Sequence, residues 1–223
     1  PRRQLKRHWR PTSTRNQFIE GRTMFKINYN IPSEKHTSAN TTANSVTTVV
    51  TGGFANNRKH PRATHDYYAT EPKATELLLT LDTFDTVWEP AAGADGFMSQ
   101  VLDNHGILAR TSDKYDYKNG FEVVDFLAVK EWHGDIVTNP PYDISTDFAT
   151  HALNILQPNR KLALFLPIRY LSSKSRRELF DTHPPYKVWV ASSRLVCALN
   201  GDFKAVEGSA VDYAWIIWHK GYT

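Results

Sequence analysis

The clearest chemical signature in this sequence is the run Asn139, Pro140, Pro141 and Tyr142, which directly follows an expected strand at 135–138. The amino nitrogen of an aromatic amine is a poor nucleophile, because its lone pair is delocalised into the ring. The Asn139 side-chain oxygen and the Pro140 carbonyl can accept hydrogen bonds from such an amino group and free the lone pair, while the prolines hold both acceptors in place. Tyr142 offers a flat ring on which a base taken out of its helix can stack. The run therefore predicts a site that activates an exocyclic amine.

A second motif, made of small residues, lies between an expected strand at 86–88 and an expected helix at 97–104. It reads Glu-Pro-Ala-Ala-Gly-Ala-Asp-Gly over residues 89–96. Small residues let the backbone approach a ligand closely, and a helix N-terminus favours negative charge. Asp113 follows Gly93 at the spacing where an acidic side chain hydrogen-bonds ribose hydroxyls in nucleotide-binding units. The pattern indicates a site for a nucleoside cofactor that also carries an amino-acid carboxylate.

The elements that must position these motifs alternate between strands and helices. Short strands are expected at 86–88, 107–111, 135–138, 161–166, 188–190 and 213–218, and helices at 72–81, 97–104, 146–156 and 173–180. This alternation favours an α/β fold with a mostly parallel, doubly wound sheet that is covered on both faces. Ligands bind at the carboxyl ends of the strands in such sheets, and both motifs fall there.

Together the motifs resemble the amino-methyltransferases with a Rossmann-like fold, and most closely the small adenine-N6 DNA methyltransferases of phages and prophages. The resemblance covers about residues 65–220. The matching segments run in the family's order: 66–72 for the cofactor carboxylate, 89–93 for the cofactor loop, 112–113 for the ribose, 125–127 for the cofactor adenine and 138–142 for catalysis. The cofactor loop departs from the family's Gly-x-Gly, because it reads Gly93-Ala94-Asp95-Gly96. We interpret this departure as one inserted residue.

The resemblance implies transfer of a methyl group from S-adenosyl-L-methionine to N6 of adenine in double-stranded DNA, by a flipped-base mechanism. It implies that the sheet closes with an antiparallel strand. The catalytic residues that it predicts are Asn139, Pro140, Pro141 and Tyr142. The predicted cofactor-binding residues are Tyr68, Thr70, Glu89, Pro90, Ala91, Gly93, Gly96, Phe97, Asp113, Asp125 and Phe126. Nucleic acid is expected to contact Lys174, Arg176, Arg177 and Arg194.

The charge of the chain is distributed unevenly. Residues 1–62 hold 12 Lys and Arg against 2 Asp and Glu, a net charge of +10, whereas residues 63–223 have a net charge of −6. We expect a basic, disordered arm over 1–62 and one methyltransferase domain over 63–223. A basic arm attracts polyanions such as nucleic acids, although a solvated segment with no such role is the alternative.

Other features narrow the class of protein. The single cysteine, Cys197, excludes an intrachain disulfide framework and suits a reducing cytosol. The resemblance implies the cytoplasm of a bacterial or phage-infected host cell. No apolar run approaches the roughly 20 residues that a membrane span needs, so no membrane association is expected. The nine histidines show no metal-ligand spacing, and no metal is expected. Trp132, Trp215 and Trp218 are expected to pack in or around the core.

Three alternative functions remain open at this stage, and the oligomeric state is open as well. The same pair of acceptors would suit amino methylation of adenine or guanine in RNA. It would also suit methylation of a glutamine side-chain amide in a protein, although those enzymes usually carry an Asp-x-Gly-x-Gly-x-Gly loop that is lacking in this sequence. The third alternative is an inactive nucleic-acid-binding module, because the glycine loop is altered.

Overall fold

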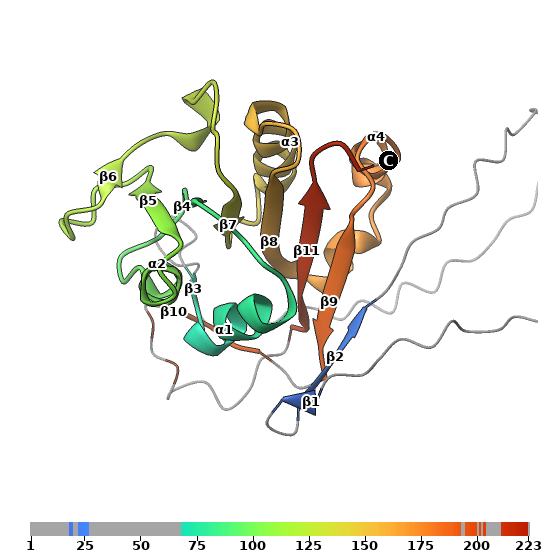
Figure 1. Cartoon of the computed structure of the whole chain (residues 1–223), viewed down its shortest axis with the longest axis horizontal. Helices are drawn as coiled ribbons and strands as arrows, with labels where there is room; N and C mark the ends of the chain where they lie inside the picture. Colours follow the sequence, from blue (N-terminus) through green and yellow to red (C-terminus); the bar gives the residue numbers. More distant parts are fainter. Residues whose placement is uncertain are drawn as a thin grey trace, which may run out of the picture.

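The computed structural model of this chain describes residues 18–19, 22–26, 68–192, 195–199, 201, 203 and 211–222. A nine-stranded sheet with the order β1-β2-β9-β11-β8-β7-β4-β5-β6 forms its centre, and a separate two-stranded sheet pairs β10 with β3 (Figure 1). The strands are β1 (Phe18–Ile19), β2 (Arg22–Lys26), β3 (Tyr68–Thr70), β4 (Val87–Glu89), β5 (Leu108–Asp113), β6 (Glu122–Val123), β7 (Ile136–Thr138), β8 (Lys161–Pro167), β9 (Lys187–Ala191), β10 (Cys197–Leu199) and β11 (Tyr213–His219). The helices are α1 (Pro72–Leu81), α2 (Phe97–Asn104), α3 (Ser145–Ile155) and α4 (Arg177–Thr182), with 3₁₀ turns at Phe126–Ala128, Ile168–Leu171 and Lys174–Arg176.

The direction of the strands agrees with the expected fold class. β6, β5, β4, β7 and β8 pair in parallel, and β11 runs antiparallel to both β8 and β9. The predicted parallel sheet with an antiparallel closing strand is therefore confirmed. The chain passes from β4 to β5 on one side and later returns to β7 on the other, so the strand order reverses at β4. Such a reversal is the usual ligand-binding position in open α/β sheets.

Alternating side chains of β8 and β11 separate the core into two layers. Leu162, Leu164 and Leu166 of β8 belong to the cluster that contains Phe148 of α3 and Leu179 of α4. The residues between them, together with Trp215 of β11, belong to the cluster formed with α1 and α2. Since both faces of β8 are covered, its sequence is a continuous apolar run rather than an alternating one. Helices thus pack on both faces of the sheet, which is the arrangement of a doubly wound fold.

The tryptophans pack as expected. Trp215 and Trp218 are at most 1% exposed. The Trp215 indole N–H donates to the Ala74 carbonyl at 2.8 Å, and that of Trp218 donates to the His183 carbonyl at 2.9 Å. Trp132 packs against the same core as Trp218.

Two parts of the structure differ from the expectations. β2 pairs antiparallel with β9, so Arg22–Lys26 extends the sheet of the domain although it lies inside the expected arm over 1–62. β1, which also lies inside this arm, pairs with β2, and the other residues of the arm lie outside the described residues. The expected single helix at 173–180 is divided into the 3₁₀ turn Lys174–Arg176 and the short helix α4. The Arg176 side chain donates to the Tyr170 carbonyl at 2.7 Å, which holds the chain in this bend.

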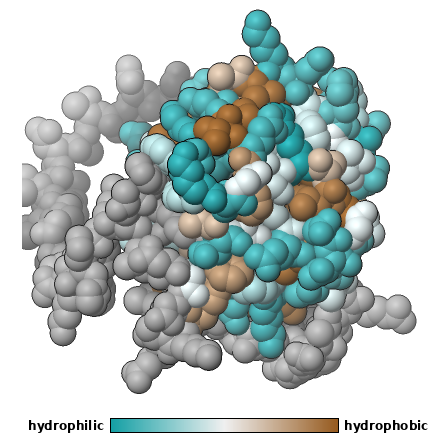
Figure 2. Space-filling view, turned by 90° about the vertical axis from the view of Figure 1, so that its left-hand side faces the viewer, coloured by the Kyte–Doolittle hydropathy of each residue, from teal (hydrophilic) through white to brown (hydrophobic). Residues whose placement is uncertain are grey.

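The surface on the β6 side of the sheet is mostly hydrophilic, and its apolar residues form small separate groups (Figure 2). Within the described ranges, no helix combines the length and the apolar character that crossing a membrane requires.

Candidate active site

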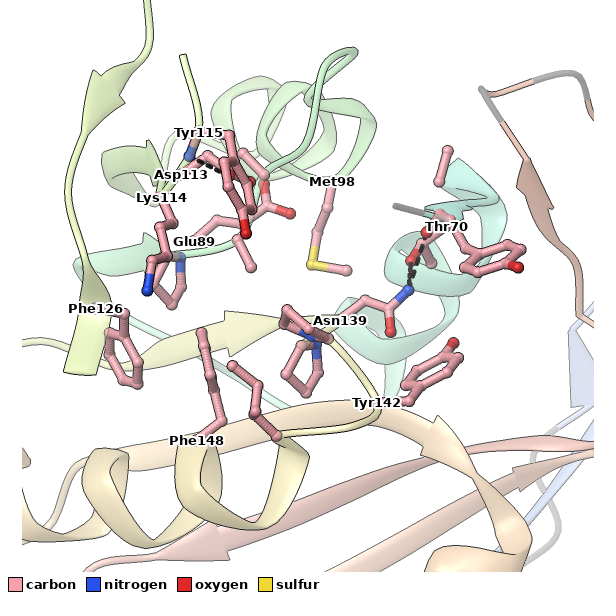
Figure 3. Close-up of a pocket in the computed structure, with 18 of the residues that line it drawn as sticks. Thr70, Glu89, Met98, Asp113, Lys114, Tyr115, Phe126, Asn139, Tyr142 and Phe148 are labelled. Atoms are coloured by element: carbon pink, nitrogen blue, oxygen red, sulfur yellow. Dashed lines mark hydrogen bonds between the residues drawn. The ribbon is translucent and has the colours of Figure 1, made fainter. Parts of the chain in front are cut away.

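A cavity of about 440 Å³ opens at the carboxyl ends of β4, β5 and β7, where the strand order reverses (Figure 3). The segments that follow these three strands form most of its wall, and β3 and α3 complete it. The residues that line the cavity are Tyr68, Ala69, Thr70, Glu89, Pro90, Ala91, Ala92, Phe97, Met98, Asp113, Lys114, Tyr115, Tyr117, Asp125, Phe126, Leu127, Asn139, Pro140, Pro141, Tyr142, Asp143, Ile144 and Phe148. Both sequence motifs therefore meet at one cavity.

All of the predicted catalytic residues and most of the predicted cofactor residues line this cavity, but Gly93 and Gly96 do not. The Gly93 N–H donates to Oδ2 of Asp113 at 2.9 Å. Gly96 has a φ of 57°, and a Cβ atom there would lie 2.4 Å from the Phe121 ring. The two glycines thus shape the loop and bring its small residues to the cavity, rather than lining it themselves.

Several lining residues were not predicted from the sequence. Lys114, Tyr115 and Tyr117 follow Asp113 at the end of β5, and their place directly after a strand end is a signal that could have identified them. Ile144 and Phe148 lie at the start of α3, where the sequence predicts that an apolar residue packs in the core. No local pattern distinguishes the half-buried Ile144, which precedes the helix, or the buried Phe148 from apolar residues that only pack in the core.

Asp113 is buried and connects two loops of the cavity. Its Oδ2 accepts the Gly93 N–H from the loop after β4, and its Oδ1 accepts the Tyr115 N–H at 2.9 Å from the loop after β5. The carboxylate therefore holds both loops while it faces the cavity.

We expect Asp113→Ala to weaken binding of S-adenosyl-L-methionine by about 1–3 kcal/mol, because the predicted hydrogen bonds to the ribose hydroxyls would be lost together with those to both loops. Isothermal titration calorimetry measures this change. Asp103→Ala, which alters an exposed residue of α2, is the matched control and should bind like the wild type. Equal affinities of Asp113→Ala and the wild type would contradict the assigned role.

Glu89 is 2% exposed at the end of β4. Burial raises the pKa of its carboxyl to about 8, and the nearby negative charge of Asp113 acts in the same direction, against the hydrogen bond from Ser99. Ser99 also lies 2.8 Å from the Thr111 hydroxyl, so the carboxyl sits in a small polar network. A cationic group in the cavity would favour the ionised form of this acid.

Another part of the cavity wall is aromatic and carries one acidic side chain. Phe126 is 2% exposed, stacks on Phe148 at 4.4 Å between ring centroids and meets the edge of Trp88 at 5.3 Å. Asp125 accepts the Leu127 N–H at 3.1 Å and forms an ion pair with Lys114 at 2.9 Å. The pKa of Asp125 is lowered, chiefly by the hydrogen bond from Lys114. An apolar wall beside a carboxylate acceptor suits a nucleobase with an amino group.

The Asn139 side chain is held with its nitrogen away from Tyr142. Nδ2 donates to the Thr70 hydroxyl at 2.9 Å and to the Tyr68 carbonyl at 3.2 Å (Figure 3). Oδ1 is buried and has no hydrogen-bond partner among the residues that the structure describes. A buried acceptor without a partner is unfavourable, so it usually marks a site for a missing donor.

Tyr142 and Cys197 meet beside this amide. The Tyr142 hydroxyl lies 3.5 Å from the Cys197 Sγ atom, and Asn139 Nδ2 lies 3.7 Å from the same sulfur. Burial raises the pKa of the Cys197 thiol to about 11, so the sulfur stays protonated and is not a nucleophile. Burial also raises the pKa of Tyr142 well above its ordinary value.

The residues predicted to contact nucleic acid lie outside the cavity lining. Arg176 bonds to the carbonyls of Tyr170 and Arg169 and its guanidinium lies 4.2 Å from the Tyr170 ring centroid, so its side chain has a structural role. Arg177 is exposed and pairs with Asp181 at 3.1 Å. Lys174 is exposed, and Arg194 lies outside the described residues. In the part of the chain that the structure describes, no three potential metal ligands gather.

Comparisons with known proteins bear on the fold. No protein-family model and no curated protein matches the sequence. Among solved structures, a putative RNA methyltransferase from Pyrococcus horikoshii matches with a TM-score of 0.50 and 14% identity, over 73% of this chain and 90% of that one. The chain has a Rossmann-like methyltransferase fold.

Two further structures with this methyltransferase fold are similar to the chain. TrmN from Thermus thermophilus gives a TM-score of 0.48 and 18% identity over 67% of this chain, which spans only 48% of TrmN. An S-adenosylmethionine-dependent O-methyltransferase from Thermotoga maritima gives a TM-score of 0.49 and 14% identity, over 70% of this chain and 68% of that one.

Proposed function

We propose that this chain is an S-adenosyl-L-methionine-dependent methyltransferase that modifies N6 of adenine in DNA. The observation that carries the proposal is the buried Oδ1 of Asn139, an acceptor without a described partner, in an Asn-Pro-Pro-Tyr turn at the edge of the cavity. Resemblance to the adenine-N6 DNA methyltransferases supports the choice of substrate, and the methyltransferase fold supports the reaction class.

The lining residues fit the cofactor group by group. Glu89 supplies a carboxyl for an ammonium group, Asp113 an acceptor for ribose hydroxyls, and Asp125 with Phe126 an acceptor and a flat wall for adenine. When bound, S-adenosyl-L-methionine supplies an electrophilic methyl group on a sulfonium. Phe126, Ile144 and Phe148 give the adenine end an apolar wall.

Asn139 and Pro140 act on the target amine. The Asn139 Oδ1 atom and the Pro140 carbonyl accept its two N–H groups, which draws the nitrogen toward tetrahedral geometry and frees its lone pair. These contacts strengthen as positive charge develops on the nitrogen, so they stabilise the transition state more than the ground state. No carboxylate base is required, because the amine loses its extra proton after the new N–C bond has formed.

Tyr142 is proposed to hold the flipped base by its ring. Its hydroxyl is engaged with Cys197 and Tyr213, so the ring is the part available to a ligand. We expect Tyr142→Phe to keep most of the methylation rate, and Tyr142→Ala to weaken target binding by roughly 1–3 kcal/mol and to lower the rate as well. Fluorescence anisotropy with a labelled duplex measures the binding. Tyr222→Ala, on an exposed tyrosine, is the control. Undiminished binding by Tyr142→Ala would refute stacking on this ring.

The proposal is tested by incubating the protein with methyl-labelled cofactor and, separately, with adenine-containing duplex DNA, RNA of the same sequence and a bacterial protein extract. Digestion of the DNA to nucleosides should yield labelled N6-methyldeoxyadenosine. Label found only in RNA or on glutamine would overturn the substrate. Cofactor binding without transfer to any of the three would favour a binding module instead.

DNA is the proposed partner, and the positive charges of Lys174 and Arg177 are its proposed contacts within the described residues. Both are exposed and follow β8, whose carboxyl end lies at the same sheet edge as the cavity. The net charge of +10 over residues 1–62 would add a contribution that weakens as salt increases.

A further inference from the structure

The Asn139 amide is held in one orientation by hydrogen bonds from its Nδ2 atom to residues that are distant in the sequence. Its Nδ2 atom faces the Tyr68 carbonyl at 3.2 Å and the Thr70 hydroxyl at 2.9 Å. A carbonyl oxygen can only accept hydrogen bonds, so the amino side of the amide must point toward Tyr68. A half-turn of the amide would bring Oδ1 against that carbonyl and place two oxygen atoms in contact.

The groups that surround Nδ2 come from the small sheet of β3 and β10. Thr70 and Cys197 are opposite each other in this sheet. Thr70 is 5% exposed, and the Cys197 sulfur lies 3.7 Å from Nδ2. The Cys197 thiol is also hydrogen-bonded with the Thr70 side chain. The Thr70 hydroxyl can therefore accept from Asn139 while its own proton is directed to the sulfur.

This arrangement matters for the chemistry, because the two ends of an amide are opposite in character. With Oδ1 on the Tyr142 side, the amide accepts a hydrogen bond from a target amino group. With the amide reversed, Nδ2 would present N–H groups to the N–H groups of the target, which repels them. The backbone of the Pro-Pro turn places the Asn139 side chain but does not decide which end faces the target.

We infer that Thr70 is a positioning residue for catalysis: its hydroxyl, with the Tyr68 carbonyl, holds the Asn139 amide so that Oδ1 faces the target amine. The inference rests on the proposed function for its kinetic consequence. The amide orientation itself is independent of which substrate is methylated. It gives Thr70 a task beyond the cofactor contact that its sequence position suggests, and it gives the β3–β10 sheet a role in catalysis.

The orientation is tested by NMR on the full chain labelled with ¹⁵N. The Asn139 side-chain NH₂ signals are identified by their loss in Asn139→Ala. Thr70→Val removes the hydroxyl at nearly constant volume, and we expect it to shift these signals and speed their exchange with solvent. Thr70→Ser keeps the hydroxyl and should restore them. Thr75→Val removes a hydroxyl that is equally buried, but that has no hydrogen-bond partner among the described residues, and should leave them unchanged. Asn139 signals that are the same in Thr70→Val and wild type would overturn the inference.

The catalytic consequence is tested by single-turnover methylation of duplex DNA at saturating cofactor. We expect Thr70→Val to remain slower by roughly 10²-fold when the cofactor is saturating, with rescue in Thr70→Ser. If saturating cofactor restored the methylation rate of Thr70→Val to that of the wild type, Thr70 would be a cofactor ligand only, and the positioning role would be refuted. If the wild type methylates none of the offered amines, the proposed function fails, whereas the NMR comparison still decides how the amide is held.

Discussion

Replacing Asn139 by alanine is expected to lower the single-turnover rate of methyl transfer by about 10²–10³-fold, while the dissociation constant of the cofactor stays unchanged. The substitution removes the only side-chain acceptor that the proposed mechanism places on the target amine. Because that contact strengthens as the nitrogen becomes tetrahedral, its loss affects turnover rather than ground-state binding. The rate is measured by rapid quench with methyl-labelled cofactor bound before the DNA is added.

Asn154→Ala is the matched control, since Asn154 is an exposed asparagine on α3. It should retain the wild-type rate. Full activity in Asn139→Ala would refute the assigned chemistry. A parallel loss of cofactor binding would instead indicate that the amide supports the cavity wall.

The stability of the protein is expected to fall as the pH is raised from about 5 to about 9, and Glu89→Gln should remove most of this decline. The pKa of Glu89 is about 8 in the folded chain, against an ordinary value of 4.5. Between these two values the folded state holds a proton that the unfolded state has lost, so stability decreases with increasing pH and levels off above the folded pKa. A shift of this size corresponds to roughly 3–5 kcal/mol, and the neutral glutamine amide replaces the protonated carboxyl throughout.

Urea unfolding at a series of pH values measures the effect. Glu131→Gln changes an exposed glutamate and should keep the wild-type profile. Burial also raises the pKa of Asp135. Its carboxyl therefore makes stability decrease with increasing pH as well, starting from a lower pH than Glu89. A part of the decline should accordingly persist in Glu89→Gln. Profiles of the wild type and Glu89→Gln that run parallel would show that the Glu89 carboxyl is ionised at neutral pH. Saturating cofactor should flatten the wild-type profile, because an ammonium group beside the carboxyl favours its ionised form.

The parts of the fold that follow from local pattern could be predicted from the sequence. Helix α1 begins at Pro72 and ends at Leu81 as expected, because proline suits a first helical position and the leucines repeat on one face. The run at 161–166 reads as a buried strand for the reason that both faces of β8 are covered. The two cavity motifs could be identified from the sequence, because small residues and prolines that follow a strand have few purely structural explanations.

The remaining parts depend on contacts between distant segments. Cys197 reaches the catalytic amide only through the pairing of β10 with β3, and it lies 58 positions from Asn139 in the sequence. Arg176 reads as a phosphate contact, yet the fold places it on the Tyr170 ring and backbone. The basic composition of residues 1–62 gave no sign that Arg22–Lys26 pairs with β9, because sheet pairing depends on a free edge elsewhere in the chain.

The place of β11 has a consequence for how the protein is made. β11 comes last in sequence among the described strands, yet it lies between β8 and β9 in the sheet. While the protein is being synthesised, β8 and β9 each keep one edge unpaired until β11 has left the ribosome. Unpaired strand edges pair readily with other chains. A ribosome that stalls before Tyr213 would therefore release a product prone to aggregation, whose two core layers cannot close. Expression at reduced temperature, with holding chaperones present during this interval, should accordingly raise the yield of soluble protein.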